Sequence, residues 1–409
     1  MNRVFGVLPR RIVYWLSYFQ YVWLKMRLRA LRNDRSSGII YFIPEVPGHF
    51  MHAAPLYKLI GGTVVTASKK NKKEIMEKYQ VECVAVDDVA ISDVRNFKSD
   101  VLAKTFEYIN KHAKVAIFYD LMDIGGRLSV PSIFLHHGVS LGKVRAFWEG
   151  ESRIRYVKQL DYIANGDQFS HEIMLKRGVP EAKLLDLTIA RTTEIIQKTV
   201  LFRWRNARKA RRKLGVGRSR KIIVYMPSYW SKNSLEDTGL NLLRQIDEKY
   251  TLIFWPHPQT DRKIVQKYEE IAKRRSNIII GQRVKGLDIL DLYAVADLFV
   301  ADPPTSVVSD MILANKPVVF AYGGGENATI ADLPWPLEMV VSSALRLDCA
   351  ASYHREVVNN IVGRALRVGL DKRAYRSFID AVFYNTTGSA AVRTAQYIEV
   401  IVRDGKLKN

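Results

Sequence analysis

Residues 296–322 constrain the fold of this chain more than any other stretch, because short apolar runs alternate there with turn-forming residues. Leu298–Ala301 is an apolar run of strand length that ends at Asp302. The two prolines that follow cannot continue a strand or donate to its hydrogen-bond ladder. A helical pattern then covers residues 307–314, and Asn315 and the proline after it are typical of a helix end. The stretch therefore predicts a strand, a tight turn, a helix and a second strand.

The start of the predicted helix carries two hydroxyl side chains, Thr305 and Ser306, and either can cap it. If the preceding strand belongs to a parallel sheet, this helix N-terminus lies at the carboxyl edge of the sheet. Free N–H groups and the positive end of the helix dipole favour an anion there. A plain capped helix has the same pattern, so the local sequence leaves both interpretations open.

The same alternation of apolar runs and helical patterns continues along both halves of the chain. A repeated strand–helix pattern is typical of parallel, doubly wound sheets, and 409 residues are enough for two or three domains. We therefore predict an α/β fold with two Rossmann-like, doubly wound domains facing a cleft. The predicted parts are an N-terminal amphipathic helix in residues 1–36, a first domain in 37–195, a basic linker in 196–220, and a second domain in 221–409 with a closing C-terminal helix.

Residues 1–36 differ from the rest of the chain because they are strongly basic and aromatic. The apolar run within them, at 12–24, is shorter than the ~20 residues needed to cross a bilayer. Wound as a helix, it separates an apolar aromatic side from a basic side, which is typical of a helix lying on anionic lipid. A helix packed on its own domain is the alternative. The expected membrane contacts are Arg11, Trp15, Phe19, Trp23, Lys25 and Arg29.

The charge balance indicates an anionic partner. Lys and Arg number 63 against 41 Asp and Glu, which gives a formal net charge of +22 and suits a nucleic acid, an anionic membrane or a phosphate-rich substrate. The two cysteines, Cys83 and Cys349, are too few for a disulfide framework and favour a reducing, cytoplasmic setting. Phosphate-loop, dinucleotide-binding and zinc-protease motifs do not occur, and no Asp-x-Asp pair stands out. We therefore predict no required cofactor or metal, and leave a divalent metal open.

Histidines and polar side chains follow several of the predicted strands, where ligands of such sheets bind. His137 follows a strand and precedes Gly138, and an imidazole can take a proton near neutral pH. His257 lies between two prolines on a rigid turn. Each histidine taken alone is more often structural than catalytic. Further candidates for an acceptor or cleft role are His49, His52, His136, Asn165 and Asp302.

Several of these segments together resemble the CDP-glycerol glycerophosphotransferases, which are the teichoic-acid primases and polymerases. Residues 137–143 look like that family's His-Gly-Thr-Pro-Leu-Lys-Lys box, and residues 225–228 look like its Tyr-Ala-Pro-Thr turn. Residues 255–258 resemble its Leu-His-Pro, and residues 302–317 resemble its Thr-Asp-Tyr-Ser-Ser segment with the Asp and Lys-Pro that follow. The segments occur in the family's order along the chain.

The resemblance implies a GT-B fold in which the second domain holds the nucleotide. It implies a peripheral enzyme on the cytoplasmic face of the bacterial membrane, acting on a lipid-linked glycan or polyol-phosphate acceptor in cell-wall or capsule polymer synthesis. Its donor would be CDP-glycerol or a related CDP-alditol, and CMP would leave. In this scheme His137 is the general base on the acceptor hydroxyl. His257 is the second catalytic candidate. The groups expected to bind the donor pyrophosphate and stabilise charge as the bond breaks are His257, Ser228, Thr305 and Ser306, with Lys143 and Arg191 as weaker candidates.

Two other functions fit parts of the sequence. A GT-B glycosyltransferase using a nucleotide sugar would need the same cleft and anion site. A basic nucleic-acid-binding protein would explain the net charge, but the cations are scattered and no recognisable nucleic-acid module accompanies them. We therefore expect no nucleic-acid partner.

Overall fold

The computed structural model describes residues 10–31, 38–44, 47–66, 68–86, 99–120, 122–124, 126–136, 151–229, 233–303, 305–323, 340, 345–384 and 389–406. The chain forms two compact units. Unit 1 contains Met1–Val139, Val144–Glu194 and Val382–Asn409, and unit 2 contains Ser140–Lys143 and Ile195–Ala381.

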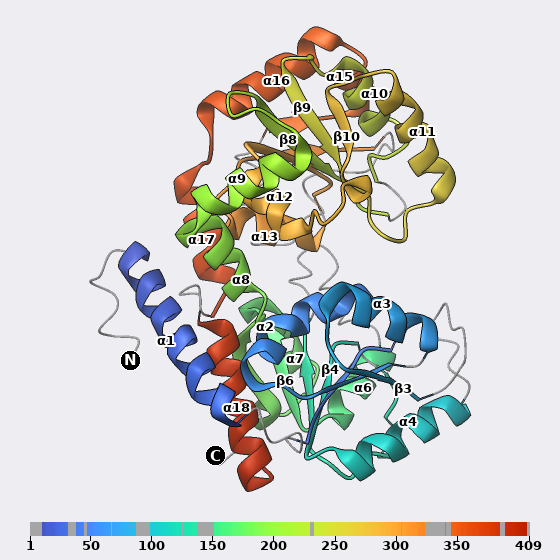
Figure 1. Cartoon of the computed structure of the whole chain (residues 1–409), viewed down its shortest axis with the longest axis vertical. Helices are drawn as coiled ribbons and strands as arrows, with labels where there is room; N and C mark the ends of the chain where they lie inside the picture. The colour runs from blue at the N-terminus through green and yellow to red at the C-terminus, as the bar shows by residue number, and fades with distance from the viewer. Residues whose placement is uncertain are drawn as a thin grey trace. The chain divides into compact units, whose positions relative to one another are not determined.

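Unit 1 is built on a seven-stranded parallel sheet with the order β3-β2-β1-β4-β5-β6-β7 (Figure 1). Its strands are β1 (Ile39–Phe42), β2 (Thr63–Thr66), β3 (Cys83–Ala85), β4 (Val115–Phe118), β5 (Ser132–Leu135), β6 (Tyr162–Gly166) and β7 (Leu184–Thr188). Its helices are α1 (Arg10–Leu31), the short 3-10 helix η2 (Pro47–His49), α2 (Phe50–Ile60), α3 (Lys69–Tyr79), α4 (Ser99–His112), α6 (Glu151–Gln159), α7 (Gln168–Lys176), the 3-10 helix η4 (Glu181–Lys183), α8 (Thr192–Ile196), which runs on into unit 2, and α18 (Ala390–Asp404).

Unit 2 repeats the design with a six-stranded parallel sheet in the order β10-β9-β8-β11-β12-β13. Its strands are β8 (Lys221–Met226), β9 (Tyr250–Phe254), β10 (Ile278–Ile280), β11 (Leu298–Ala301), β12 (Val318–Ala321) and β13 (Leu345–Leu347). Its helices are the π-helix η5 (Gln197–Leu201), α9 (Arg203–Leu214), α10 (Thr238–Gln245), α11 (Arg262–Lys273), the 3-10 helix η6 (Gly281–Arg283), α12 (Ile289–Val295), α13 (Ser306–Leu313), α15 (Cys349–Ser352), α16 (Arg355–Val368) and α17 (Lys372–Val382).

The strand order creates a topological switch point in each sheet. In unit 1, β1 leads to β2 on one side while β4 leads to β5 on the other, so the loops after β1 and β4 diverge. In unit 2, β8 and β11 are neighbours that lead away to β9 and β12 in the same manner. Loops that diverge at the carboxyl ends of parallel strands leave a crevice in which ligands of such folds bind.

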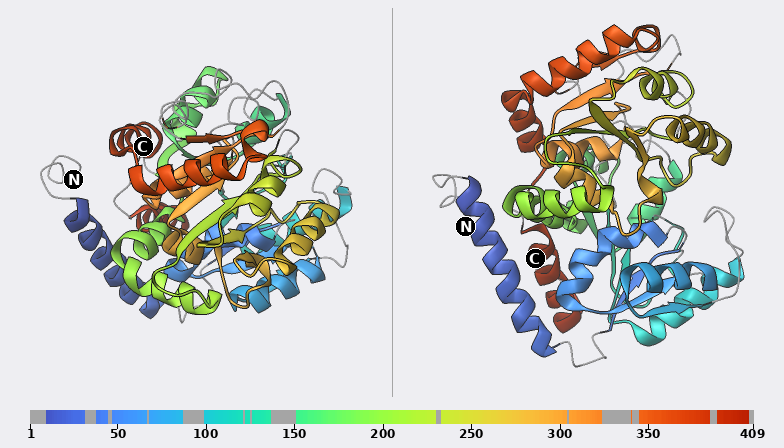
Figure 2. Two further views of the ribbon diagram at one scale, coloured as in Figure 1. Left: turned by 90° about the horizontal axis from the view of Figure 1, so that it is seen from above. Right: turned by 45° about the horizontal axis from the view of Figure 1, so that its top comes forward.

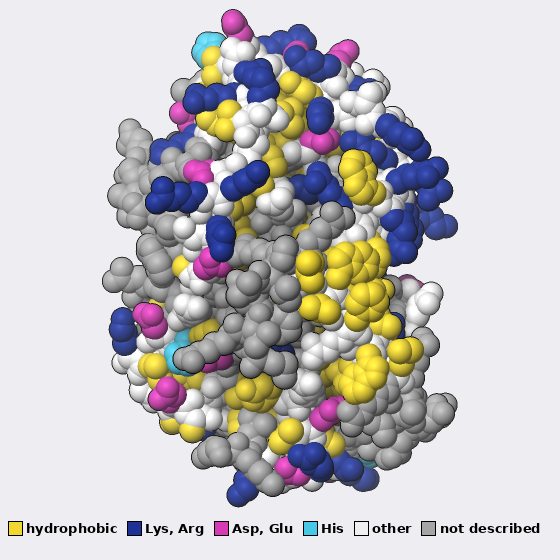
Figure 3. Space-filling model, turned by 90° about the vertical axis from the view of Figure 1, so that its left-hand side faces the viewer, with side chains coloured by type: hydrophobic (Ala, Val, Ile, Leu, Met, Phe, Trp, Pro, Cys, Tyr) yellow, Lys and Arg dark blue, Asp and Glu magenta, His cyan; other side chains and the backbone are white. Residues whose placement is uncertain are grey.

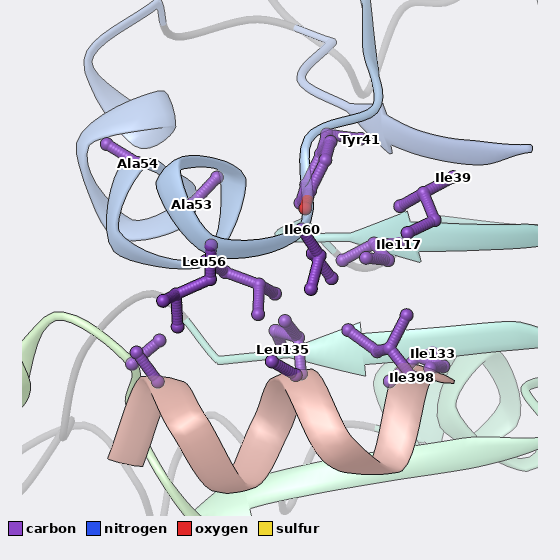
Figure 4. Close-up of a cluster of buried hydrophobic side chains, with 14 of the residues drawn as sticks. Ile39, Tyr41, Ala53, Ala54, Leu56, Ile60, Ile117, Ile133, Leu135 and Ile398 are labelled. Carbon is purple, nitrogen blue, oxygen red and sulfur yellow. The ribbon is translucent and has the colours of Figure 1, made fainter. Parts of the chain in front are cut away.

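The C-terminal helix corrects the predicted domain division. We assigned residues 221–409 to the second domain, but the structure places α18 in unit 1. Buried apolar residues of α18 recur at helical spacing and join the core formed by α2 and the first sheet. Figure 4 shows Ile398 of α18 among Leu56, Ile60 and Leu135 of that core. A long-range contact with unit 1 therefore decides the place of this helix.

Most of the predicted basic linker at 196–220 is the helix α9, which belongs to unit 2. Two ion pairs tie α9 to neighbouring elements of unit 2: Arg211 with Asp297 at 3.2 Å, and Lys213 with Asp291 at 2.5 Å. The buried Ala210 faces inward from the same helix. The segment is thus an integral part of unit 2.

Helix α1 packs on unit 1 beside α2 and α18, as Figures 1 and 2 show. Its buried residues are Val13, Ser17, Tyr21 and Leu24, which fall on one side of the helix. Large hydrophobic residues on another side are exposed: Ile12, Leu16, Phe19, Trp23 and Met26. Hydrophobic side chains also gather on the molecular face drawn in Figure 3. Among the described residues, no helix combines the length and hydropathy that crossing a membrane requires.

Candidate functional site

The switch point of the second sheet is organised by the buried carboxylate of Asp302, directly after β11. Its Oδ2 accepts a hydrogen bond from the backbone N–H of Ser228 at 2.6 Å. Its Oδ1 accepts from the backbone N–H of Ser234 at 3.2 Å and from the Ser234 hydroxyl. Asp302 therefore ties the loop after β8 to the turn after β11. We proposed a cleft role for Asp302 and pyrophosphate binding for Ser228, and the structure places these two residues against each other.

The charge on Asp302 is costly at this depth. Burial raises the pKa of the Asp302 carboxyl to about 6, while hydrogen bonds from Ser234 and Ser228 act in the opposite direction. The network continues outward, since the hydroxyls of Tyr225 and Ser234 lie 2.7 Å apart and Tyr268 donates to the carbonyl of Leu235 at 2.5 Å. Ser234 and Tyr268 carry no functional signal in the sequence, and Tyr225 is marked only as part of the turn at 225–228, because only the fold brings these residues to Asp302.

The turn after β11 leads into α13 as the sequence predicts. Thr305 is the N-cap residue of α13 in an extended conformation, and its side chain makes no capping hydrogen bond. Its Oγ1 is buried and has no hydrogen-bond partner among the described residues. The helix ends with Asn315 in the left-handed conformation, with φ of 58°, and Lys316 N–H bonds back to the Met311 carbonyl at 3.1 Å.

This helix N-terminus has the features of an anion site. The first backbone N–H groups of a helix lack intrahelical partners and carry the positive end of the dipole. A buried hydroxyl without a partner beside them adds one more donor, and leaving it unsatisfied costs free energy. The side chain of Ser306, which we also predicted to bind here, lies outside the described residues.

His257 follows β9, the strand next to β8, and its side chain is exposed on the predicted rigid turn. Its Nδ1 accepts a hydrogen bond from the backbone N–H of Gln259 at 3.1 Å, so the neutral ring carries its proton on Nε2. The ring stacks on Tyr229, with centroids 4.1 Å apart and planes at 23°. An imidazole held in this way can donate a hydrogen bond to an anion without first being protonated. Tyr229 carries no functional signal in the sequence.

The remaining predicted residues belong to unit 1 or lie outside the described part of the chain. His49 follows β1, and its Nδ1 lies 3.0 Å from Oδ2 of Asp120, which follows β4. His52 and His136 are buried. Asn165 lies in β6, but its side chain is outside the described residues, as are those of Arg11 and Arg29 in α1 and the whole of His137 and Lys143.

Arg191 belongs to a different unit from the other described residues that we expect to bind the donor. It is buried with 5% of its surface exposed, between β7 and α8 of unit 1. Ser228, Asp302, Thr305 and His257 all belong to unit 2. Within the described ranges, no group of three or more His, Cys, Asp and Glu side chains has an arrangement that could hold a metal ion.

Comparisons with known proteins are consistent in family and fold. A sequence profile of the CDP-glycerol:poly(glycerophosphate) glycerophosphotransferase family matches residues 97–324. No curated protein matches the chain in sequence. A variant of the wall teichoic acid polymerase TagF is similar in structure with a TM-score of 0.61 and 13% identity over 96% of this chain and 98% of that chain. Another TagF structure, soaked with CDPG, has a TM-score of 0.59 and 14% identity over 96% and 98% of the two chains.

Two other similar structures belong to proteins with different activities. Anabaena HepE in complex with UDP and glucose has a TM-score of 0.56 and 13% identity over 88% of this chain and 99% of that chain. The UDP-GlcNAc 2-epimerase of Neisseria meningitidis bound to UDP-GlcNAc has a TM-score of 0.56 and 9% identity over 88% and 100% of the two chains. Similarities at this level of identity establish the fold. The prediction of a GT-B-like pair of parallel-sheet α/β domains is therefore confirmed.

Proposed function

The chain belongs to the CDP-glycerol:poly(glycerophosphate) glycerophosphotransferase family and is a CDP-glycerol glycerophosphotransferase-like enzyme of teichoic acid synthesis, and from that premise we propose what it transfers and to which acceptor. The transferred group is an alditol phosphate, most simply glycerol phosphate, from a CDP-linked donor. The acceptor is a hydroxyl of a lipid-linked glycan or polyol phosphate. The product extends a cell-wall or capsule polymer.

The reaction forms one P–O bond and breaks another. The acceptor oxygen attacks the phosphorus that bears the glycerol group, and the bond from that phosphorus to the oxygen of CMP breaks. The acceptor proton passes to a general base, which the family resemblance assigns to His137. Negative charge grows on the phosphoryl oxygens and on departing CMP, so donors fixed around the pyrophosphate accelerate the step.

The single observation that carries the donor assignment is the buried, unpartnered hydroxyl of Thr305 at the N-terminus of α13. Thr305 lies three residues after Asp302, at the switch point of the second sheet. A pyrophosphate placed here would receive hydrogen bonds from Thr305 and from the first backbone N–H groups of α13. His257 would supply a further N–H from Nε2. Backbone N–H groups and uncharged side chains can therefore provide many of the hydrogen bonds to the diphosphate.

The test compares two isosteric substitutions by the affinity of the free protein for CDP-glycerol. Thr305→Val removes a buried hydroxyl that has no described partner, so the variant should be at least as stable as the wild type. Affinity should fall about 10-fold or more, because hydrogen bonds to charged groups contribute about 1.5–3 kcal/mol. Thr199→Val is the control: it removes a buried hydroxyl that donates to the Ile195 carbonyl at 2.7 Å, so it should cost stability without changing affinity. Unchanged affinity of Thr305→Val for CDP-glycerol would show that the diphosphate does not bind at this turn.

The two histidines are tested by turnover. A general base contributes about 10²–10⁴ in rate, so His137→Ala should lose at least that much release of CMP while remaining folded. We expect a loss of similar size in His257→Ala. Near-normal turnover in either variant would remove that residue from the scheme.

We also propose that the enzyme is peripheral to the cytoplasmic face of the membrane and contacts anionic lipid through α1. Support comes from the large hydrophobic residues that α1 exposes beside its basic sequence, with Phe19 62% and Trp23 55% exposed. Phe19→Ser with Trp23→Ser should reduce co-sedimentation with phosphatidylglycerol vesicles. Val368→Ser, at a residue of unit 2 that is 71% exposed, should not. Equal co-sedimentation of all three proteins would contradict the proposal.

A glycosyltransferase using a nucleotide sugar is the second candidate, favoured by the structural similarity to HepE in complex with UDP and glucose. The anion site on α13 would serve either donor, because both carry a diphosphate. Release of CMP from CDP-glycerol, compared with release of UDP from UDP-sugars under the same conditions, separates the two.

A further inference from the structure

Helix α9 of unit 2 is basic along its whole length. Its residues, Arg203–Leu214, include no Asp or Glu. One side of the helix is used by the fold: Ala210 and Leu214 are buried there, and the helix packs beside α12 (Figure 1). Two of its cations, Arg211 and Lys213, are held by the ion pairs to unit 2 described above. These contacts leave the opposite side of α9 to be explained.

The opposite side carries four exposed cations and one exposed aromatic ring. The cations are Arg205, Arg208, Lys209 and Arg212. Residues three and four apart are neighbours on a helix, so these side chains form one continuous strip. Trp204 is four residues before Arg208 and extends the strip at its N-terminal end, with 89% of its surface exposed. We call these five residues the α9 face.

The positive charges of the α9 face are not balanced within the described part of the chain. Among those residues, no carboxylate forms an ion pair with any of the four cations, whereas the inward-facing Arg211 and Lys213 each have one. Like charges four residues apart on a helix repel and destabilise it. An external anionic surface would relieve this repulsion, which the fold itself leaves in place.

We propose that the α9 face docks unit 2 on an anionic lipid surface. Clustered Lys and Arg side chains are attracted to anionic headgroups, and an indole, with its apolar body and polar N–H, is typical of the boundary between membrane and water. A nucleic acid also carries phosphates, but the proposed lipid-linked acceptor places a membrane beside this enzyme. The inference rests on the proposed peripheral location and adds a contact from the unit that does not contain α1.

The experiment measures co-sedimentation of the full chain with vesicles of phosphatidylglycerol and phosphatidylcholine. The background is Phe19→Ser with Trp23→Ser, so that binding through α1 does not mask the effect. Adding Arg205→Gln, Arg208→Gln and Arg212→Gln should lower the partition coefficient about 100-fold, because each cation near an anionic surface contributes about fivefold. The difference should disappear on pure phosphatidylcholine and shrink at high salt, which screens exposed charges.

Two further variants separate local docking from net charge. Arg262→Gln, Lys263→Gln and Lys273→Gln together remove the same charge from exposed positions of α11 and should change the partition coefficient by less than about threefold, because those cations lie outside the α9 face. Trp204→Phe keeps an aromatic ring and should bind vesicles nearly as well as the wild type. The quenching of tryptophan fluorescence by brominated lipid should nevertheless fall in this variant, because the exposed indole is lost.

The outcomes distinguish the α9 face from the proposed location. Equal partition of the triple variant and its background would overturn the inference, and so would an equal loss in the α11 control. Loss of oligonucleotide binding by the triple variant without loss of vesicle binding would assign the face to nucleic acid instead. A wild-type protein that fails to sediment with phosphatidylglycerol vesicles would overturn the proposed location and the α9 contact with it. Melting followed by circular dichroism and an unchanged affinity for CDP-glycerol show that unit 2 of each variant is folded.

Discussion

Replacing Asp302 by Asn should remove a pH-dependent cost from the stability of unit 2. The carboxyl is buried, and its pKa rises from 3.8 to about 6. A raised pKa means that the folded state holds the proton to higher pH than the unfolded state does. The native carboxyl therefore binds more protons than the unfolded one between about pH 4 and pH 6, and the free energy of unfolding falls as pH rises through that window.

The size of this change in the free energy of unfolding follows from the change in the pKa of Asp302. About two pKa units at 1.36 kcal/mol each give about 3 kcal/mol, most of it lost by the wild-type protein between pH 4 and pH 7. Asn has nearly the same volume and no charge, so the free energy of unfolding of Asp302→Asn does not depend on pH through this side chain. Whatever the two proteins' difference at pH 4, it should move by about 2–3 kcal/mol in favour of Asp302→Asn by pH 7. Donor affinity should nevertheless fall, because the NH2 group of Asn replaces one of the two carboxylate oxygens and would face the backbone N–H of either Ser228 or Ser234.

The assay is urea unfolding followed by circular dichroism at several values between pH 4 and pH 8. Hydrogen exchange in peptides covering β8 and β11 identifies the transition of unit 2. Asp247→Asn is a control of opposite sign, because hydrogen bonds from Lys249 and Arg355 lower the pKa of that partly exposed carboxyl. Its contribution is present above the unfolded pKa and is lost as pH falls. A difference between wild type and Asp302→Asn that stays constant from pH 4 to pH 8 would refute the reasoning.

Two further changes test the packing around this network and the opposite edge of the same sheet. Gly239→Ala should destabilise unit 2 by about 1–3 kcal/mol in urea unfolding, because the new Cβ would collide with the hydroxyls of Tyr225 and Tyr268. Gly217→Ala is the control, because its new Cβ meets nothing within 4 Å. Equal stability of the two variants would contradict the expectation. Burial lowers the pKa of Lys316 to about 7, and its Nζ donates to the carbonyls of Ala294 and Ala296. The lysine of the folded protein therefore loses its proton at a lower pH than the lysine of the unfolded chain. The stability of the wild type should rise by about 3 kcal/mol relative to Lys316→Met between pH 7 and pH 9.5. A stability difference that does not change over this range would contradict a lowered pKa of Lys316.

Local sequence determined the elements and many of their ends. The apolar run at Leu298–Ala301 is strand β11, Thr305 is the N-cap residue of α13, and Asn315 follows the helix in the left-handed conformation. These features depend on side-chain periodicity, proline geometry and caps, which act within a few residues. The alternation of such elements was enough to predict two parallel-sheet domains.

The sequence also identified candidate residues at strand ends without saying which of them meet. His49 was recognised as a candidate, but its partner Asp120 is 71 residues away. Ser228 was expected on the donor, but its backbone is held by Asp302. Tyr229 and Ser234 carried no signal, because an aromatic or a serine in a loop is common and only the neighbouring strand gives it a partner.

Tertiary structure decided the order of the strands, and with it the two switch points. Strand order depends on which apolar faces bury one another across long stretches of chain, and period-two or period-3.6 patterns contain no information about that choice. The same holds for α18, whose apolar stripe was readable from the sequence. Its place in unit 1 follows only from the complementary surface of α2 and the first sheet, on which Ile398 is buried.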